Sequence, residues 1–189
     1  MTHSSLPTPT SALVVSVSKD SAHRFSKPPV ASVTLRAGWG VEGDVHAGTT
    51  VQHRYLVKKD PTRANLTQVH FMAEELFAEL GEKGFDVSAG QLGENITTRG
   101  VDLINLPLGT LLGLGSDAVV EITGLRSPCS LINQFQHGLM KACVSKDPNG
   151  TVIRKAGIMG IVIRGGSVAP GDEMTITLPE GEHQPLGVV

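Results

Sequence analysis

The chain has 189 residues and a formal net charge of −2, which suits one domain and gives no basic footprint for nucleic acid or an anionic membrane. Hydrophobic residues make up 40% of the chain and charged residues 18%, as in ordinary globular proteins, and the apolar runs are too short to span a bilayer. Aromatic residues reach only 4%, so we expect a mostly aliphatic core. The 22 glycines and 11 prolines favour many turns, as in a β-rich fold.

The N-terminal segment and the cysteine count bear on localisation. Residues 1–11 are polar, carry Pro7 and Pro9, and lack a basic start followed by an apolar segment, so they predict a disordered tail and no secretory signal. The two cysteines, Cys129 and Cys143, argue against a disulfide scaffold. We therefore expect a cytoplasmic protein.

Seven segments carry the β-branched or alternating apolar residues that are typical of strands. In chain order they are residues 12–17, 30–35, 68–71, 106–114, 118–123, 158–163 and 173–178. Apolar residues at helical spacing predict two short helical regions, one beginning at Met72 and one at Leu131, the second interrupted near Gly138. The pattern predicts a mainly β protein with short helices (α+β), in a single domain over residues 12–178 with a polar, mobile tail over 179–189.

Several loops separate these elements. The segment 38–48 holds four glycines, which predicts a backbone that turns tightly or approaches another group closely. Within it, Asp44 and His46 share one side of any extended conformation. Residues 57–66 are expected to form an exposed loop, and Asp147-Pro-Asn-Gly150 a turn.

The strongest chemical signal is the stretch Gly124-Leu-Arg-Ser-Pro-Cys129-Ser, which leads from a predicted strand into a predicted helix. A thiol at a helix N-terminus is favoured as the thiolate, and Arg126 is close enough in sequence to add to that effect. A buried structural thiol is the alternative for any free cysteine. Cys143 fits that alternative because it lies between Met140 and Val144, whereas Cys129 lies in a polar turn.

The order of the motifs resembles the MOSC family, the domain named for the C-terminal part of molybdenum cofactor sulfurase. The matching segments are Gly43-Asp-Val-His-Ala-Gly48, Gly90-Gln-Leu-Gly-Glu-Asn-Ile96, Thr98-Arg-Gly100, Leu106-Pro-Leu-Gly109, Gly124-Leu-Arg-Ser-Pro-Cys129, Lys155-Ala-Gly-Ile-Met-Gly160 and Pro170-Gly-Asp172. Each is weak alone, but seven in the expected order cover nearly the whole chain.

The resemblance implies a MOSC-type β-barrel and a cysteine that meets the molybdenum cofactor (molybdopterin), either as a metal ligand or as a persulfide carrier. That cysteine corresponds to Cys129. Stand-alone bacterial relatives are linked to the reduction of N-hydroxylated bases. The chain has neither a pyridoxal-phosphate domain nor enough cysteines for an iron–sulfur cluster, so sulfur or electrons are expected from an external partner protein.

Other residues in the matching segments are candidates for binding the cofactor. His46 can donate to a phosphate or a pterin, although a satisfied surface histidine beside a capping Asp44 is equally compatible with the sequence. Asn95 can present a donor and an acceptor to a heterocycle edge, and Arg99 can bind a phosphate; the alternative for both is a solvated strand face.

Arg54, Arg154 and Lys155 are candidates for the anionic end of the cofactor, with a plain surface charge as the alternative for each. Arg126, in the same matching segment as Cys129, is a further candidate for binding the cofactor.

Three functions are consistent with these residues. The first is an oxidoreductase that reduces N-hydroxylated compounds by oxo transfer, with Cys129 as molybdenum ligand and an external redox partner. The second is a non-catalytic carrier of persulfide sulfur or of the cofactor, supplied by a donor protein. The third is a β-barrel that shares only the architecture and binds no cofactor.

Overall fold

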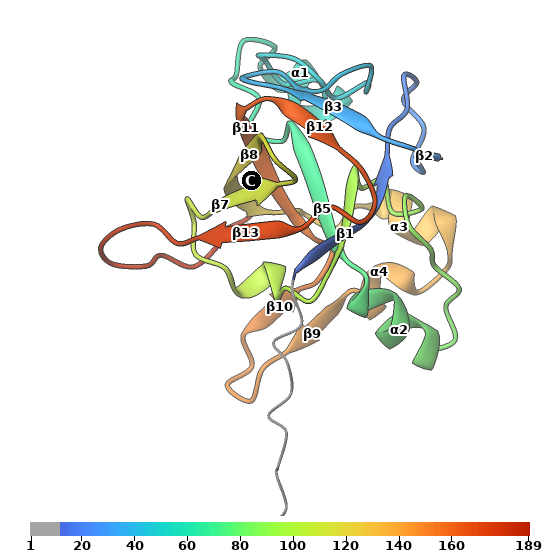
Figure 1. The fold of residues 1–189 in the computed structure, drawn as a ribbon. Coiled ribbons are helices and arrows are strands. Elements are labelled where there is room, and N and C mark those ends of the chain that lie inside the picture. The colour runs from blue at the N-terminus through green and yellow to red at the C-terminus, as the bar shows by residue number, and fades with distance from the viewer. Residues whose placement is uncertain (1–11) are drawn as a thin grey trace, which may run out of the picture.

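The computed structural model describes residues 12–189, which form a β-dominated fold with short helices (Figure 1). Its strands are β1 (Leu13–Ser18), β2 (Pro29–Val30), β3 (Val33–Arg36), β4 (Gly40–Val41), β5 (Val69–Ala73), β6 (Ile96–Arg99), β7 (Leu111–Leu114), β8 (Ala118–Leu125), β9 (Val144–Lys146), β10 (Val152–Arg154), β11 (Ile158–Arg164), β12 (Gly166–Val168) and β13 (Met174–Thr177). Its helices are α1 (Arg54–Lys59), α2 (Glu75–Glu82), α3 (Ser130–Phe135), α4 (Leu139–Ala142) and a 3₁₀ turn, η1 (Leu103–Asn105). The predicted predominance of strands is confirmed.

The largest sheet has eight strands in the order β13-β7-β8-β11-β5-β6-β1-β2. Neighbouring strands are antiparallel except for β5 and β6, which are parallel. A parallel pair needs a crossover connection, and here α2 and the loop that follows it supply one. The central strand β11 pairs with β8 on one side and β5 on the other.

The predicted MOSC-type β-barrel is found only in part, because no sheet among residues 12–189 closes on itself. An isolated bridge between Leu13 and Glu173 links β1 to the start of β13, but β13 then continues along β7 instead. The strand β2 also pairs with β1, at Val17 and Ser18. The sheet therefore curves until β1 meets the start of β13, where the Met174 N–H donates to the Ala12 carbonyl and the Val14 N–H to the Asp172 carbonyl, without a continuous ladder between the two strands.

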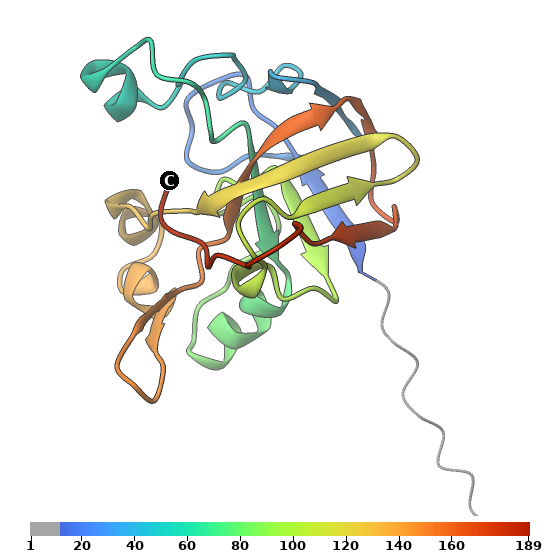
Figure 2. The same ribbon diagram turned by 90° about the vertical axis from the view of Figure 1, so that its left-hand side faces the viewer.

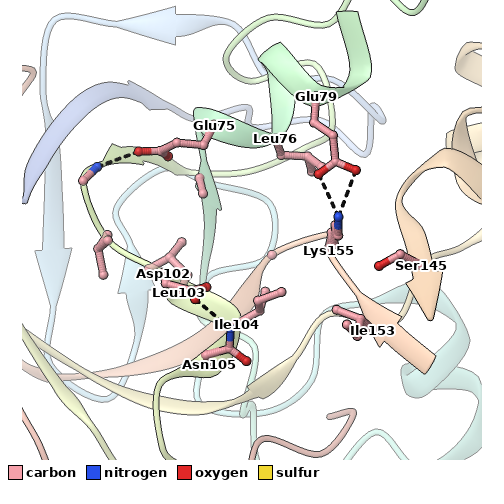
Figure 3. Close-up of a pocket in the computed structure, with 14 residues that line it drawn as sticks. Glu75, Leu76, Glu79, Asp102, Leu103, Ile104, Asn105, Ser145, Ile153 and Lys155 are labelled. Atoms are coloured by element: carbon pink, nitrogen blue, oxygen red, sulfur yellow. Dashed lines mark hydrogen bonds and ion pairs between the residues drawn. The ribbon is translucent and has the colours of Figure 1, made fainter. Parts of the chain in front are cut away.

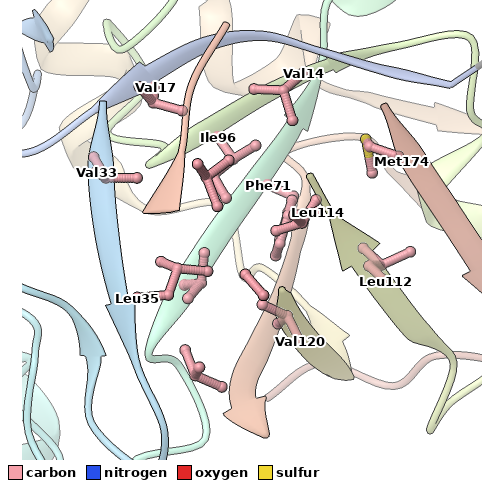
Figure 4. Packing of buried hydrophobic residues seen from close by; sticks show 14 of the residues in the cluster. Val14, Val17, Val33, Leu35, Phe71, Ile96, Leu112, Leu114, Val120 and Met174 are labelled. Atoms are coloured by element: carbon pink, nitrogen blue, oxygen red, sulfur yellow. The ribbon is translucent and has the colours of Figure 1, made fainter. Parts of the chain in front are cut away.

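The main core lies between this sheet and a three-stranded sheet of order β12-β3-β4 (Figure 4). Val33 and Leu35 of β3 pack into the same cluster as Val14, Ile96 and Leu112 of the large sheet. The cluster is almost entirely aliphatic, as the composition predicts. Burial of this apolar area is the main stabilising contribution to the fold.

A second cluster lies beneath the helices at one end of the molecule. Leu76 and Leu80 of α2 pack there with Ile132 of α3, and Cys143 is fully buried among them. The assignment of Cys143 as a buried structural thiol is thus confirmed. Cys129 packs against the edge of this cluster and stays partly exposed.

Some local predictions differ from the structure. The segment 57–66 begins inside α1, a helix without buried residues and therefore without an apolar stripe in the sequence. The 147–150 turn is confirmed and joins the hairpin β9–β10. The end of the 179–189 tail is held on β8, because Leu125 bridges Val188 and donates its N–H to the Gly187 carbonyl. Residues 1–11, predicted to be disordered, lie outside the described residues.

No helix within residues 12–189 has the length and apolar character needed to cross a membrane.

Candidate functional site

Cys129 lies at the N-cap position of α3, directly after the strand β8 and a short connecting segment. This is the placement that the sequence predicts. The segment is fixed by a hydrogen bond from the Arg126 N–H to the Gly157 carbonyl, at 2.9 Å. The thiol is free and partly exposed, so it remains accessible to a ligand.

The guanidinium of Arg126 is buried beside this thiol. Its Nη1 atom is inaccessible and has no hydrogen-bond partner among the described residues. Its Cζ atom lies 5.9 Å from the centre of the Phe25 ring. Burial lowers the pKa of Arg126, while nearby Cys129 and Glu94 act in the opposite direction. A buried donor without a partner is costly, which marks this atom as a place for an acceptor.

Glu94 is a fully buried carboxylate that was not among the predicted site residues. Its Oε1 accepts the Gly90 N–H at 2.6 Å, and its Oε2 accepts the Leu92 N–H at 3.2 Å. Burial raises the pKa of Glu94, although these backbone donors and the charge of Arg126 oppose the rise. The available signal was a glutamate flanked by turn glycines inside a matching motif.

Asp44 and Lys27 form a buried ion pair, with Lys27 Nζ 2.9 Å from Asp44 Oδ2 and side-chain exposures of only 3% and 1%. Burial raises the pKa of Asp44, but hydrogen bonds from His46 and Lys27 outweigh it, so the pKa lies well below its ordinary value. Burial lowers the pKa of Lys27, and the charge of Asp44 opposes that shift. Asp44 also accepts the His46 N–H at 2.9 Å, and the His46 Nδ1 atom lies 3.3 Å from Asp44 Oδ1.

Asn95 connects these groups to the sheet. Its Nδ2 donates to the Ser18 carbonyl at 3.2 Å and to Asp44 Oδ2 at 3.1 Å, while its Oδ1 accepts the His70 N–H at 3.2 Å. Both ends of the amide are therefore engaged inside the protein. The predicted contact of Asn95 with a cofactor remains a prediction, and the structure assigns the side chain a role in positioning Asp44.

Three histidines from separate segments meet beside Asp44. The ring of His46 lies edge-on to that of His23 at 5.7 Å and stacked with that of His53 at 6.4 Å. Burial lowers the pKa of His23, and the charge of Arg54 lowers it further. Burial likewise lowers the pKa of His53, with added effects from His46 and Arg126. The three imidazoles thus form one cluster, and the charges of Arg54 and Arg126 act on it. Neither His23 nor His53 was among the predicted site residues.

Arg99 and Lys155, predicted with the same site, are held instead by carboxylates at the helix α2. Arg99 Nε lies 2.6 Å from Glu74 Oε2, and Lys155 Nζ lies 2.7 Å from Glu79 Oε2. Lys155 lines a cavity of about 580 Å³ between α2, η1 and the β9–β10 hairpin, where Figure 3 shows its ammonium pointing at Glu79. The structure therefore places Arg126 beside Cys129 and links Asn95 to His46 through Asp44. Arg54 adjoins His53 in sequence, whereas Arg99 pairs with Glu74 and Lys155 lines this other cavity.

His70 provides a pH-dependent stability test. It is buried, its Nε2 lies 2.9 Å from the Ala156 carbonyl, and burial holds its pKa well below the ordinary value of 6.5. The unfolded chain then takes up a proton that the folded chain does not, so stability is lost as pH falls through about 6.5. We expect thermal melting temperatures to fall from about pH 7.5 to 5.5, and less steeply in His70→Gln than in the wild type. His137→Gln, at an exposed position, should keep the wild-type slope; equal slopes in all three proteins would contradict the prediction.

Comparisons with known proteins agree with this architecture. A family model described as the MOSC domain matches residues 58–175, well over half of the chain. The structure is similar to that of YuaD from Bacillus subtilis, with 22% identity, coverage of 90% of this chain and 98% of that chain, and a TM-score of 0.72.

It is also similar to YiiM from Escherichia coli, at 20% identity over 93% of this chain and 74% of that chain with a TM-score of 0.60. YiiM from Geobacillus stearothermophilus matches at 23% identity over 88% and 73% of the two chains, with a TM-score of 0.56. A sequence search of the curated proteins finds no match. At these identities the solved structures establish the fold, and the family model over residues 58–175 establishes that the chain belongs to the MOSC domain family.

Proposed function

We propose that this MOSC protein binds a molybdenum cofactor at Cys129 and supports the reduction of N-hydroxylated compounds. The observation that carries the proposal is the buried, unpartnered Nη1 of Arg126 beside a partly exposed thiol. Such a donor fits an anionic or carbonyl-bearing ligand that enters next to the sulfur. The family link to the cofactor supports the same assignment.

The residues around Cys129 fit the chemistry of that group. A soft thiolate is a suitable ligand for a soft metal–sulfur centre, and Cys129 is the accessible thiol of the two. Arg126 would donate from Nη1 to an oxygen of the pterin or its phosphate. His46, His53 and Arg54 would face the anionic end, since arginine carries a positive charge and the two imidazoles can donate hydrogen bonds.

Asp44 and Asn95 would act by positioning. Asp44 fixes His46 through its backbone N–H and its Nδ1 atom, which leaves Nε2 for a ligand. Asn95 and Lys27 in turn hold Asp44 from the opposite side. When bound, the cofactor supplies the oxo-transfer chemistry, and the protein supplies binding and orientation.

The overall reaction would convert an N–OH group to N–H with the uptake of two electrons and two protons and the release of water. The electrons would come from an external redox partner. Both thiols of the chain are free, as a cytoplasmic setting requires.

A carrier of persulfide sulfur or of the cofactor is the second candidate. A reductase needs a substrate cavity beside its metal. One cavity of the described residues is lined by α2 and the β9–β10 hairpin, and another by Phe85, Gly138 and Lys141. Neither includes Cys129. A carrier would need only an accessible thiol.

Metal and pterin analysis tests the proposal. Protein purified anaerobically from a host that makes molybdenum cofactor should contain about one molybdenum and one pterin per chain. Cys129→Ser should lose the metal, whereas Cys143→Ser serves as the matched control because it removes the buried thiol. Arg126→Gln should retain less pterin than the wild type.

The pattern of losses separates the candidates. Molybdenum lost in Cys129→Ser together with turnover of an N-hydroxylated base by a chemical reductant supports the reductase. Bound pterin or persulfide without turnover supports the carrier. A folded wild type without molybdenum, pterin or persulfide rejects both.

A further inference from the structure

Residues 52–63 form a flap that is closed at its base. Thr50 and Ala64 form an isolated β-bridge there, and the Val51 N–H donates to the Arg63 carbonyl at 2.9 Å. The Asn65 N–H also donates to the Thr49 carbonyl at 3.0 Å. The flap contains α1, so its backbone is ordered by its own helix and by this closed base.

The flap contributes nothing to the hydrophobic core. None of its residues is buried, and α1 packs no buried side chain against the rest of the protein. Tyr55 is 67% exposed and Val57 is 38% exposed. A helix that presents an aromatic and an aliphatic side chain to solvent is not explained by the stability of the fold.

The flap is also strongly basic. It carries Arg54, Lys58, Lys59 and Arg63 against one carboxylate, Asp60, which gives it a charge of +3 in a chain whose formal net charge is −2. Within residues 12–189, none of the four basic side chains lies within 4.0 Å of a carboxylate oxygen, whereas five basic residues elsewhere do (Arg24, Lys27, Lys83, Arg99 and Lys155). Unpaired charges gathered on one exposed segment create a local positive potential.

The flap adjoins the site at Cys129. His53, at its start, stacks on His46 at 6.4 Å, and the pKa of His53 responds to the charge of Arg126. In both ribbon views α1 lies at the end of the molecule opposite the β9–β10 hairpin (Figures 1 and 2). A molecule bound to the flap would therefore sit beside the cluster that leads to the thiol.

We propose that the flap is a docking surface for an acidic protein partner that serves the site at Cys129. What the partner delivers, electrons or sulfur, rests on the proposed function; the docking itself does not. Positive charge on the flap complements an acidic surface, and Tyr55 and Arg54 are of the residue types that dominate protein interfaces. The residues outside the flap carry a formal net charge of −5. They would therefore repel the parts of an extended polyanion or an anionic membrane that reach past the flap.

Fluorescence anisotropy with a labelled glutamate-alanine peptide tests the docking without any cofactor. We expect saturable binding at low ionic strength that weakens with added salt. Removing three flap charges in Lys58→Gln/Lys59→Gln/Arg63→Gln should raise the Kd about tenfold. The matched control Lys141→Gln/Lys146→Gln/Arg154→Gln removes the same charge from α4 and the β9–β10 hairpin, and it should change the Kd by less than about twofold. Tyr55→Ser should weaken binding without changing the charge.

Each other result rejects the proposal. Binding that is absent in the wild type, or weakened equally in the two triple variants, shows that the flap is not a specific surface. Tighter binding of phosphatidylglycerol vesicles or of a single-stranded oligonucleotide than of the peptide identifies a different class of partner. Because the peptide assay needs no molybdenum, a failure here is distinguishable from a failure of the proposed function.

Discussion

Asp44→Asn is expected to lower the free energy of unfolding by about 3–5 kcal/mol. The substitution keeps the shape of the side chain but removes its charge, and it leaves the ammonium of Lys27, only 3% exposed, without a counter-ion. A buried charge without a partner is far more costly than the pair is favourable. Urea denaturation followed by circular dichroism measures the loss.

Two further variants make this result specific. In Lys27→Met/Asp44→Asn the buried charge is gone, so we expect the double variant to be more stable than Asp44→Asn alone. Glu74→Gln breaks the exposed pair with Arg99 and should cost less than about 1 kcal/mol. An Asp44→Asn variant as mild as Glu74→Gln would mean that Lys27 is not held as a buried cation.

Gly157→Ala is expected to destabilise the protein by more than about 3 kcal/mol. Gly157 has a φ of +93°, and a Cβ there would overlap the Phe71 carbonyl oxygen and lie 2.7 Å from His70 Nε2. The obstacle is backbone and a buried ring, so neither can move aside easily. The Gly157 carbonyl accepts the Arg126 N–H, so we expect a shift of the Gly157 backbone to displace the segment that leads to Cys129.

Gly150→Ala is the matched control for this substitution. Gly150 has a φ of +84° in the hairpin turn, but nothing lies within 4 Å of its added Cβ. It therefore incurs only the conformational cost of a side chain in the left-handed region, about 1–2 kcal/mol. Equal destabilisation of the two variants would show that the neighbours of Gly157 move aside to accept the added Cβ. A displacement of Arg126 would then no longer be expected.

Elements that bury a face could be predicted from the sequence. The strands β1, β8 and β11 carry β-branched residues and were expected close to their observed bounds. The helix α1 was missed because it buries nothing, and β9 and β10 because three residues are too few to show a pattern. Closure of the barrel depends on which strand pairs with the outer edge of β1, and that choice is made by non-local contacts.

The site was predictable where a motif places its residues next to one another, as for Arg126 and Cys129. It was not predictable where a residue's partner is distant in sequence. The ion pair of Lys27 with Asp44 and the contact of His53 with His46 arise only when separate loops meet. Likewise, Glu74 and Glu79 engage Arg99 and Lys155 from a helix whose polar face looked merely solvated in the sequence.

The position of β11 has a consequence for the order of folding. This strand joins β8 to β5 at the centre of the large sheet, yet the ribosome makes it after almost every other strand. Until β11 emerges, β5 and β8 each lack one partner strand in the nascent chain. The group β1, β5 and β6 is then not joined to the group β7 and β8, and one edge of β5 and one edge of β8 stay unpaired. We expect folding to be late and slow, and the growing chain to depend on chaperones that cover those edges.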